Sequence, residues 1–466
     1  MKRLVIISNR VANPECSEAQ GGLGVCVLDS LRERGALWFG WNGEIVPDDT
    51  EINATRTQFD ALTLATAPLT ERDYSEYYLG FANAALWPVH HNRLDLALFT
   101  QESVDGYRRV NDRFAQMLTP MLQSDDLVWV QDYHFIALGA RLRARGVDTQ
   151  IGFFLHIPFP PPDMLVAIPE HEWLLKAFFE YDLVGFQTKT DLGNFCRFVC
   201  DFMDGEMVAP DVLRLGDKLL SVAVFPVGID VDAFAAMART PEASTRILRM
   251  HRAGEPRINI IGVDRLDYTK GLPDRLRSFR RLLEIYPESC KAVTLMQIAP
   301  PTREEVRAYA DIRHELEALS GEINGEFGDF DWTPVRYIHR RVARETLAAL
   351  YRGSQVGLVT PLRDGMNLVA KEYVAAQDEE NPGVLILSRF AGAAEDLEEA
   401  LIVNPYDADE VAQAMQTAIH MPQAERIQRH SALMARIRER DACNWMKQFL
   451  GTLENSTHSL AVARIG

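Results

Sequence analysis

Short apolar runs alternate with amphipathic stretches along most of the chain. Strands inside a parallel sheet are near-continuous runs of Val, Ile, Leu and Phe, whereas helices that cover a sheet repeat their apolar residues every three or four positions. The alternation therefore predicts α/β domains with parallel sheets. The predicted strands are residues 4–8, 127–131, 151–155, 183–187, 221–227, 258–263, 292–298, 335–338, 356–360, 384–388 and 401–403.

Helical spacing is clearest over residues 104–122 and 273–286, where apolar residues recur every three or four positions. A polar helical passage near residues 231–254 separates two groups of strands. This pattern predicts two doubly wound, Rossmann-like domains, residues 1–230 and 231–444, which bind ligands at the carboxyl ends of their strands.

The charge balance narrows the class of partner. The chain has 466 residues, and 49 Lys and Arg against 66 Asp and Glu give a net charge of −17. Binding to nucleic acid or to an anionic membrane needs a basic surface, so neither is expected. The chain has no apolar run near the roughly 18 residues of a membrane span and no signal-peptide pattern at its start. We expect small-molecule substrates. If these are anionic, a protein of this net charge must bind them with a local cluster of Lys and Arg side chains.

The cysteines indicate a reducing compartment. The six are scattered and form no Cys-x-x-Cys pair, so neither a disulfide framework nor a zinc site is predicted. Cys196 and Cys200 lie four apart in a helical pattern and are predicted to be core thiols. A cytoplasmic protein is expected.

The most informative stretch is residues 361–373, Pro-Leu-Arg-Asp-Gly-Met-Asn-Leu-Val-Ala-Lys-Glu-Tyr. It follows an apolar strand, residues 356–359, and leads into a helix. A glycine-containing loop at this place presents backbone N–H groups that can hold anions and sugar hydroxyls. Glu372 lies one turn into the helix, near enough to accept from two hydroxyls. An ordinary solvated loop is the alternative, but charges this dense between apolar elements favour a binding site.

A second loop, residues 264–273, leaves strand 258–263 and precedes a helix that begins near Pro273. Arg265 and Lys270 are five residues apart on this loop. The planar guanidinium of an arginine and the compact ammonium of a lysine together suit the oxygens of a diphosphate. The alternative is that both cations pair with the neighbouring Asp264 and Asp267. The first motif makes the diphosphate site the favoured interpretation.

Two further patterns are weaker. Gly21-Gly22-Leu23-Gly24 could open a helix, but Val27 stands where a dinucleotide fingerprint needs its third glycine. Asp-x-Asp triplets, which can mark metal sites, begin at Asp230, Asp329 and Asp407. None has the flanking strand and turn of a metal site, so all three are predicted to be structural and no metal is expected.

Together with Leu4-Val5-Ile6-Ile7-Ser8-Asn9-Arg10 and His156-Ile157-Pro158-Phe159-Pro160, the two loops make the chain resemble the trehalose-6-phosphate synthase family. These are retaining glycosyltransferases of the GT-B fold, in which two Rossmann-like domains face each other across a cleft. The similarity extends to about residue 450. It implies an N-terminal acceptor-binding domain, a C-terminal nucleotide-sugar-binding domain and a final helix, from about 445, that crosses back onto the first domain.

The resemblance implies that glucose moves from UDP-glucose, or another NDP-glucose, to glucose 6-phosphate, giving α,α-trehalose 6-phosphate. Alternatives are the same fold with another acceptor (a glucosylglycerol-phosphate synthase or a pseudo-glycosyltransferase), a catalytically silent sugar-phosphate sensor, and a dehydrogenase. The retained motif residues and the incomplete glycine fingerprint disfavour the last two. No cofactor is expected. Base preference stays open, and a homo-oligomer is compatible with the sequence.

The resemblance also implies roles for individual residues. It makes four residues catalytic, namely Arg265, Lys270, His156 and Asp364. His156 and Asp364 would contact the transferred glucose. The implied reaction is a front-face substitution, in which the leaving phosphate helps to deprotonate the acceptor. Val342 would meet the base through its backbone. The implied donor site comprises Gly21, Gly22, Arg265, Lys270, Val342, Asp364, Gly365, Met366, Asn367, Leu368, Val369, Ala370, Lys371 and Glu372. The implied acceptor site comprises Arg10, Tyr78 and Arg303 near the phosphate and Trp41, Trp87 and Asp132 around the sugar.

Overall fold

A computed structural model describes residues 2–11, 35–251, 257–302 and 307–465. The chain divides into two compact units, and each is described by itself. Unit 1 comprises residues 1–227 and 442–466, and unit 2 comprises residues 228–441.

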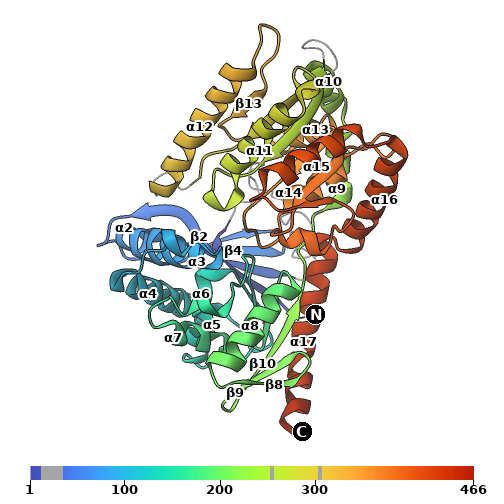
Figure 1. The fold of residues 1–466 in the computed structure, drawn as a ribbon. Helices are drawn as coiled ribbons and strands as arrows, with labels where there is room; N and C mark the ends of the chain where they lie inside the picture. Colours follow the sequence, from blue (N-terminus) through green and yellow to red (C-terminus); the bar gives the residue numbers. More distant parts are fainter. Residues whose placement is uncertain (1, 12–34, 252–256, 303–306, 466) are drawn as a thin grey trace. The chain divides into compact units, whose positions relative to one another are not determined.

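Unit 1 contains a ten-stranded sheet in the order β3-β4-β2-β1-β5-β6-β7-β10-β9-β8 (Figure 1). Its inner strands are parallel, whereas β3 and the β8–β9 hairpin pair antiparallel at the edges. β1 pairs with both β2 and β5, so the strand order reverses there, which is where doubly wound sheets bind ligands. The strands are β1 Leu4–Arg10, β2 Ala36–Val46, β3 Thr55–Phe59, β4 Leu62–Thr70, β5 Leu127–Gln131, β6 Gln150–Phe154, β7 Leu183–Phe186, β8 Glu206–Ala209, β9 Val212–Leu215 and β10 Lys218–Val224.

Helices cover this sheet, and the long C-terminal helix α17 runs beside β10 (Figure 1). Trp445 and Phe449 of α17 place their rings 4.8 and 4.7 Å from that of Trp129, which is buried on β5. The helices of unit 1 are α2 Glu71–Asp73, η2 Tyr74–Leu86, α3 Trp87–His90, η3 Leu94–Leu96, α4 Gln101–Leu118, η4 Thr119–Met121, η5 Tyr133–Phe135, α5 Leu138–Arg143, α6 Pro162–Leu165, α7 His171–Lys176, η6 Ala177–Glu180, α8 Lys189–Phe202 and α17 Ala442–Ile465.

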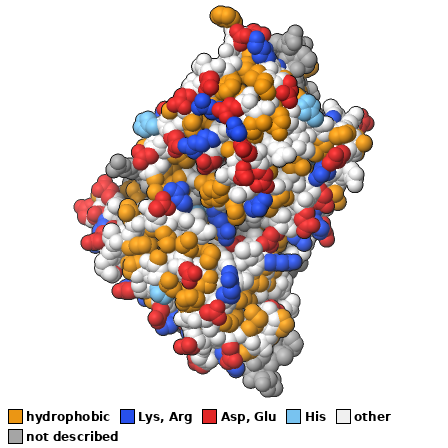
Figure 2. Space-filling view, in the orientation of Figure 1, with side chains coloured by type: hydrophobic (Ala, Val, Ile, Leu, Met, Phe, Trp, Pro, Cys, Tyr) orange, Lys and Arg blue, Asp and Glu red, His pale blue; other side chains and the backbone are white. Residues whose placement is uncertain are grey.

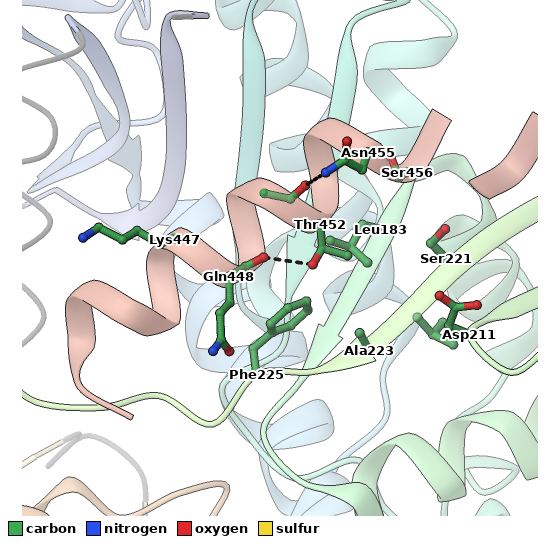
Figure 3. Close-up of a pocket in the computed structure, with 12 residues that line it drawn as sticks. Leu183, Asp211, Ser221, Ala223, Phe225, Lys447, Gln448, Thr452, Asn455 and Ser456 are labelled. Atoms are coloured by element: carbon green, nitrogen blue, oxygen red, sulfur yellow. Dashed lines mark hydrogen bonds between the residues drawn. The ribbon is translucent and has the colours of Figure 1, made fainter. Parts of the chain in front are cut away.

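A surface pocket of about 460 Å³ opens between α17 and β10 (Figure 3). Two of its polar side chains bond to the backbone of their own helix. The Thr452 hydroxyl donates to the Gln448 carbonyl at 2.9 Å, and the Asn455 amide donates to the Gly451 carbonyl at 2.8 Å. These groups therefore stabilise α17 in the absence of any ligand.

Unit 2 contains a six-stranded sheet, all parallel, in the order β13-β12-β11-β14-β15-β16. Its order reverses between β11 and β14. We name the two segments that follow these strands the β11 loop, residues 264–271, and the β14 loop, residues 360–367. The strands are β11 Ile258–Val263, β12 Val293–Ile298, β13 Val335–Ile338, β14 Val356–Val359, β15 Val384–Ser388 and β16 Leu401–Val403.

The longer helices of unit 2 pack as two groups. α11 contacts α12 and α15, whereas α9, α13 and α14 contact one another, with α10 on α13 and α16 on α14. The helices are α9 Val231–Ala238, α10 Pro241–His251, η7 Tyr268–Lys270, α11 Leu272–Ile285, η8 Pro287–Ser289, α12 Arg307–Phe327, α13 Arg344–Arg352, α14 Leu368–Ala376, η9 Gly392–Glu395, α15 Ala408–His420 and α16 Gln423–Glu439.

All the strands predicted from the apolar runs are present, with ends shifted by a few residues at most. The pattern missed β2, β3, β4, β8 and β9. Of these, β3 (Thr-Arg-Thr-Gln-Phe) and β8 are edge strands with no buried residue, whereas β2 and β4 are interior strands that are largely buried. The prediction of two core thiols was wrong: Cys200 is exposed and Cys196 is half-buried. Both fall beside the buried face of α8, which is formed by residues such as Phe195 and Phe198.

Within the ranges that the structure describes, no helix is long and apolar enough to cross a membrane. On the face seen in Figure 2, acidic and basic side chains are interspersed.

Candidate active site

The two motif-bearing loops of unit 2 lie against each other. The backbone N–H of Leu362 in the β14 loop donates to the carbonyl of Thr269 in the β11 loop at 2.8 Å. Gly271 has φ of +62°, and a Cβ there would lie 2.8 Å from the carbonyl oxygen of Thr360. Glycine is needed here both for its conformation and for the close approach. The two sequence motifs therefore form one continuous surface.

An ion pair joins the loops. Lys270, 7% exposed, places its Nζ 2.5 Å from Oδ2 of Asp364, and the side-chain amide of Asn367 donates to the same oxygen at 3.0 Å. Asp264 is paired with Arg275 at 2.7 Å. For Lys270 the alternative from the sequence is therefore wrong, because its ammonium pairs with Asp364 of the other motif. Arg265, in the same loop, is exposed.

Backbone hydrogen bonds fix the β14 loop. The Asp364 N–H donates to the carbonyl of Phe390 at 3.1 Å, and the Asp364 carbonyl accepts from Gly392 at 3.1 Å. The carbonyl of Met366, which is buried, accepts from Ala393 at 2.7 Å. Three hydrogen bonds to one neighbouring segment hold the loop in a single conformation, as a preorganised site requires.

Asn367 caps helix α14. It has φ of +80°, and its side-chain oxygen accepts from the N–H of Ala370 at 3.1 Å. First-turn N–H groups have no partner within a helix, so those of Leu368 and Val369 can donate to a ligand. The positive end of the α14 dipole and the nearby ammonium of Lys270 make the N-terminus of α14 favourable for an anion.

Glu372, one turn further along α14, is 16% exposed at its side chain. Burial raises the pKa of its carboxyl group from 4.5 to about 7, and the charge of Arg344 acts in the opposite direction. Nη2 of Arg344 is 3.9 Å from the carboxylate. The guanidinium also lies over the ring of Phe234, 5.1 Å from its centroid. Val342 comes two residues before Arg344, so this segment approaches the same helix.

Lys371 points into unit 2. Its side chain is 1% exposed, and its Nζ lies 3.1 Å from Oδ2 of Asp396. Arg440 binds the other oxygen of Asp396. Burial lowers the pKa of Lys371, and the Asp396 charge opposes this effect. In this conformation, Lys371 can contact a ligand only through its backbone.

In unit 1, a continuous group of rings includes three of the predicted acceptor residues. The Trp41 and Tyr78 centroids are 5.5 Å apart, Tyr78 stacks on His134 at 6.1 Å, His134 is 4.0 Å from Tyr133, and Tyr133 is 5.8 Å from Trp87. Tyr78 belongs to the π-helix η2, a backbone form found most often at functional sites. The structure therefore brings together residues that are far apart in the sequence.

Arg10 extends this aromatic group at the carboxyl end of β1. It is exposed, and its Cζ lies 5.3 Å from the centroid of Trp41. Gly43, with φ of +95°, lies against the guanidinium, and a Cβ there would overlap it. An exposed cation beside aromatic rings can bind a phosphate while the rings pack on the face of a sugar.

Asp132 follows β5, His156 follows β6, and a hydrogen bond joins the two residues. Asp132 has φ of +72°, which is strained for a residue other than glycine, and its Oδ1 accepts from the His156 backbone N–H at 3.1 Å. Nε2 of His156 is 2.8 Å from Oε1 of Gln131, so Nε2 carries the proton and Nδ1 is an acceptor. Burial lowers the pKa of His156 to about 4, and its ring is neutral at pH 7.

Some predicted residues cannot be placed, and others were missed. Gly21, Gly22 and Arg303 lie outside the described residues. Sequence reasoning missed Tyr133 and His134, although they directly follow Asp132 at a strand end. It also missed Arg344, whose proximity to Glu372 depends on the packing of α13 on α14.

Among the residues whose positions are given, no group of three or more His, Cys, Asp or Glu side chains could hold a metal ion. The Asp-x-Asp triplets have structural roles, as predicted. Asp230 and Asp407 cap helices α9 and α15, and Asp329 pairs with Lys291.

Comparison with known proteins shows the family of this chain. The model of glycosyltransferase family 20 matches residues 5–455. A trehalose-6-phosphate synthase from Klebsiella pneumoniae subsp. pneumoniae is 47% identical over 463 residues, covering 98% of this chain and 96% of that protein.

Two solved structures are similar throughout. An α,α-trehalose-phosphate synthase (UDP-forming) from Burkholderia xenovorans, in complex with glucose-6-phosphate, is 47% identical with a TM-score of 0.92, covering 97% of this chain and 100% of that one. A structure from E. coli, bound with UDP-2-fluoro glucose, is 45% identical with a TM-score of 0.92, covering 97% and 99%. These matches confirm the predicted class of fold, GT-B with two doubly wound domains. Since the family model spans nearly the whole chain and its relatives are nearly half identical to it, this chain belongs to glycosyltransferase family 20 and is a glycosyltransferase.

Proposed function

We propose that this glycosyltransferase moves glucose from UDP-glucose to glucose 6-phosphate and forms α,α-trehalose 6-phosphate and UDP with retention of configuration. The observation that carries the proposal is the identity of 47%, across 98% of the chain, with a trehalose-6-phosphate synthase. The complexes of its relatives with glucose-6-phosphate and with UDP-2-fluoro glucose supply the two ligand classes.

Unit 2 binds the nucleotide sugar in this proposal. Arg265, Lys270 and the first-turn amides of α14 take the diphosphate, whose leaving oxygen gains negative charge as the glycosidic bond breaks. Fixed positive groups aimed at that oxygen stabilise the transition state more than the ground state. Glu372 accepts from the ribose hydroxyls, the backbone of Val342 meets the base, and Gly21 and Gly22 complete the donor site.

Unit 1 supplies most of the residues that we assign to the acceptor. Arg10 and Tyr78 of unit 1, with Arg303 from the sequence of unit 2, take the phosphate of glucose 6-phosphate, while Trp41, Trp87 and Asp132 surround its sugar. The ring group from Trp41 to Trp87 supports this role because it places the exposed Arg10 at the end of a continuous group of rings, although Trp41 and Trp87 are themselves buried.

The chemical step is a front-face substitution. The bond from the anomeric carbon to the diphosphate oxygen breaks while a bond to the anomeric hydroxyl oxygen of glucose 6-phosphate forms, and the proton of that hydroxyl passes to the leaving phosphate. Neutral His156 accepts from a hydroxyl of the transferred glucose through Nδ1, and Asp364 accepts from another. Neither residue changes its protonation state in this scheme.

The direct test is UDP release by the purified protein with a panel of nucleotide glucoses and phosphorylated acceptors. We expect the highest kcat/KM with UDP-glucose and glucose 6-phosphate, and an α,α-linked product by NMR. A clear preference for another acceptor, such as glycerol 3-phosphate, would overturn the acceptor assignment. We further propose that the protein acts without a metal cofactor and resides in the cytoplasm, where both phosphorylated substrates are made.

A further inference from the structure

We infer that Arg344 is a positioning residue for the donor, which holds Glu372 as an ionised carboxylate directed at the ribose of the nucleotide. The inference rests on the proposed function, because it concerns the residue assigned to the ribose hydroxyls. It adds to that assignment a second side chain from a different helix and the property of Glu372 that this side chain controls.

The geometry fixes the guanidinium from two sides. Arg344 is the first residue of α13, and Glu372 belongs to α14, which packs on α13. The two side chains are 17% and 16% exposed, and the Nη2–Oε1 distance is 3.9 Å. This is longer than a hydrogen bond, so the carboxylate oxygens stay available to a ligand. The Phe234 ring beneath the guanidinium, 5.1 Å away, limits its movement.

The charge of Arg344 affects the protonation of Glu372. Burial raises the pKa of Glu372 to about 7, and Arg344 is the charged group that opposes this effect. Tyr351, buried on α13, also faces Glu372, but burial and then the charge of Glu372 raise its pKa well above 10, so it remains neutral. Only an ionised carboxylate accepts from two hydroxyls at once, whereas a protonated one carries a competing donor. Arg344 therefore raises the fraction of Glu372 that can bind the ribose at neutral pH.

The test compares R344Q, R344K and the charge-matched control R249Q, whose exposed side chain lies on α10. The KM for UDP-glucose is measured from pH 6 to pH 9, beside the Kd for UDP alone by calorimetry, since UDP retains the ribose. For R344Q we expect donor KM and UDP Kd to rise about five-fold at pH 7, the effect of moving the carboxyl pKa up by about one unit. The rise should vanish near pH 9, and kcat and the acceptor KM should stay near wild type.

R344K, which keeps the charge, should recover most of the affinity, and R249Q should behave as wild type. In the E372Q background, R344Q should cause no pH-dependent change, because the titrating group is gone. A loss that is equal at all pH values, or one that R344K shares in full, would mean that Arg344 only supports the fold, and would overturn the inference. If UDP binding shows the expected pH profile but no UDP is released from UDP-glucose with glucose 6-phosphate, the proposed function fails and the inference stands.

Discussion

Replacing Glu372 by glutamine should stabilise the free protein at alkaline pH while it weakens donor binding. Glutamine is nearly isosteric with glutamate and fills the same space on α14, but it carries no charge. In the wild-type protein Glu372 is largely buried, and burial raises the pKa of its carboxyl group from an ordinary 4.5 to about 7. The substitution removes a charge whose burial disfavours folding.

The size of the effect follows from proton linkage. Because the folded protein holds this proton more tightly than the unfolded chain, the wild type has its greatest stability from Glu372 below pH 4.5 and loses it as the pH rises to 7. Each pKa unit corresponds to about 1.36 kcal/mol. Between pH 6.0 and 8.5 the wild type should therefore lose about 1.4 kcal/mol that E372Q does not lose.

Urea unfolding at these two pH values, followed by pulsed hydrogen exchange and mass spectrometry, would report the peptides of β14 and β15 in the intact chain. The free energy of unfolding of E372Q, minus that of the wild type, should therefore increase by about 1.4 kcal/mol from pH 6.0 to pH 8.5. E345Q, an exposed substitution on α13, is the matched control and should show no such change. An E372Q difference that is the same at both pH values would refute the argument that Glu372 is destabilised by burial.

Other expected outcomes concern the remaining groups. K270A and R265A should each lower turnover by roughly 10²–10³-fold, the usual effect of removing one preorganised charge contact, and near-normal turnover in both would exclude them from the diphosphate site. K371A should reduce the free energy of unfolding by about 3 kcal/mol, because it breaks a buried ion pair with Asp396, and an unchanged urea midpoint would contradict this. R10A should raise the KM for glucose 6-phosphate and leave donor affinity nearly unchanged, and free glucose should be a poor acceptor. UDP release should survive EDTA, since side-chain cations can neutralise the diphosphate; loss of activity that Mg²⁺ restores would show that a metal takes part.

The sequence predicted the parts of the site that depend on a single strand and the loop after it. Both motifs of unit 2 follow buried apolar strands, and such strands are evident from their residues alone. The ion pair between Lys270 and Asp364 joins positions 94 residues apart, and only the pairing of β11 with β14 brings them together. Local periodicity contains no information about which strands become neighbours.

The aromatic group of unit 1 was harder to foresee for a related reason. Tyr78 lies on a π-helix, whose wider turn differs from the spacing expected of an α-helix. Trp41 lies on β2, a strand that apolar periodicity missed. The family resemblance grouped Trp41, Tyr78 and Trp87, and nothing in the sequence placed them beside Tyr133 and His134.

The pair formed by Lys270 and Asp364 bears on which ligands this part of unit 2 can bind. The ammonium of Lys270 and the carboxylate of Asp364 already neutralise each other. A ligand that separates them therefore binds well only if it supplies an acceptor for Lys270 and a donor for Asp364. A lone phosphate ion could satisfy the ammonium but would be repelled by the carboxylate beside it. A nucleotide sugar brings oxyanions for Lys270 and, on the same molecule, hydroxyl groups for Asp364. On the proposed function, the pair therefore favours a ligand that joins a phosphate to a sugar over a phosphate ion alone.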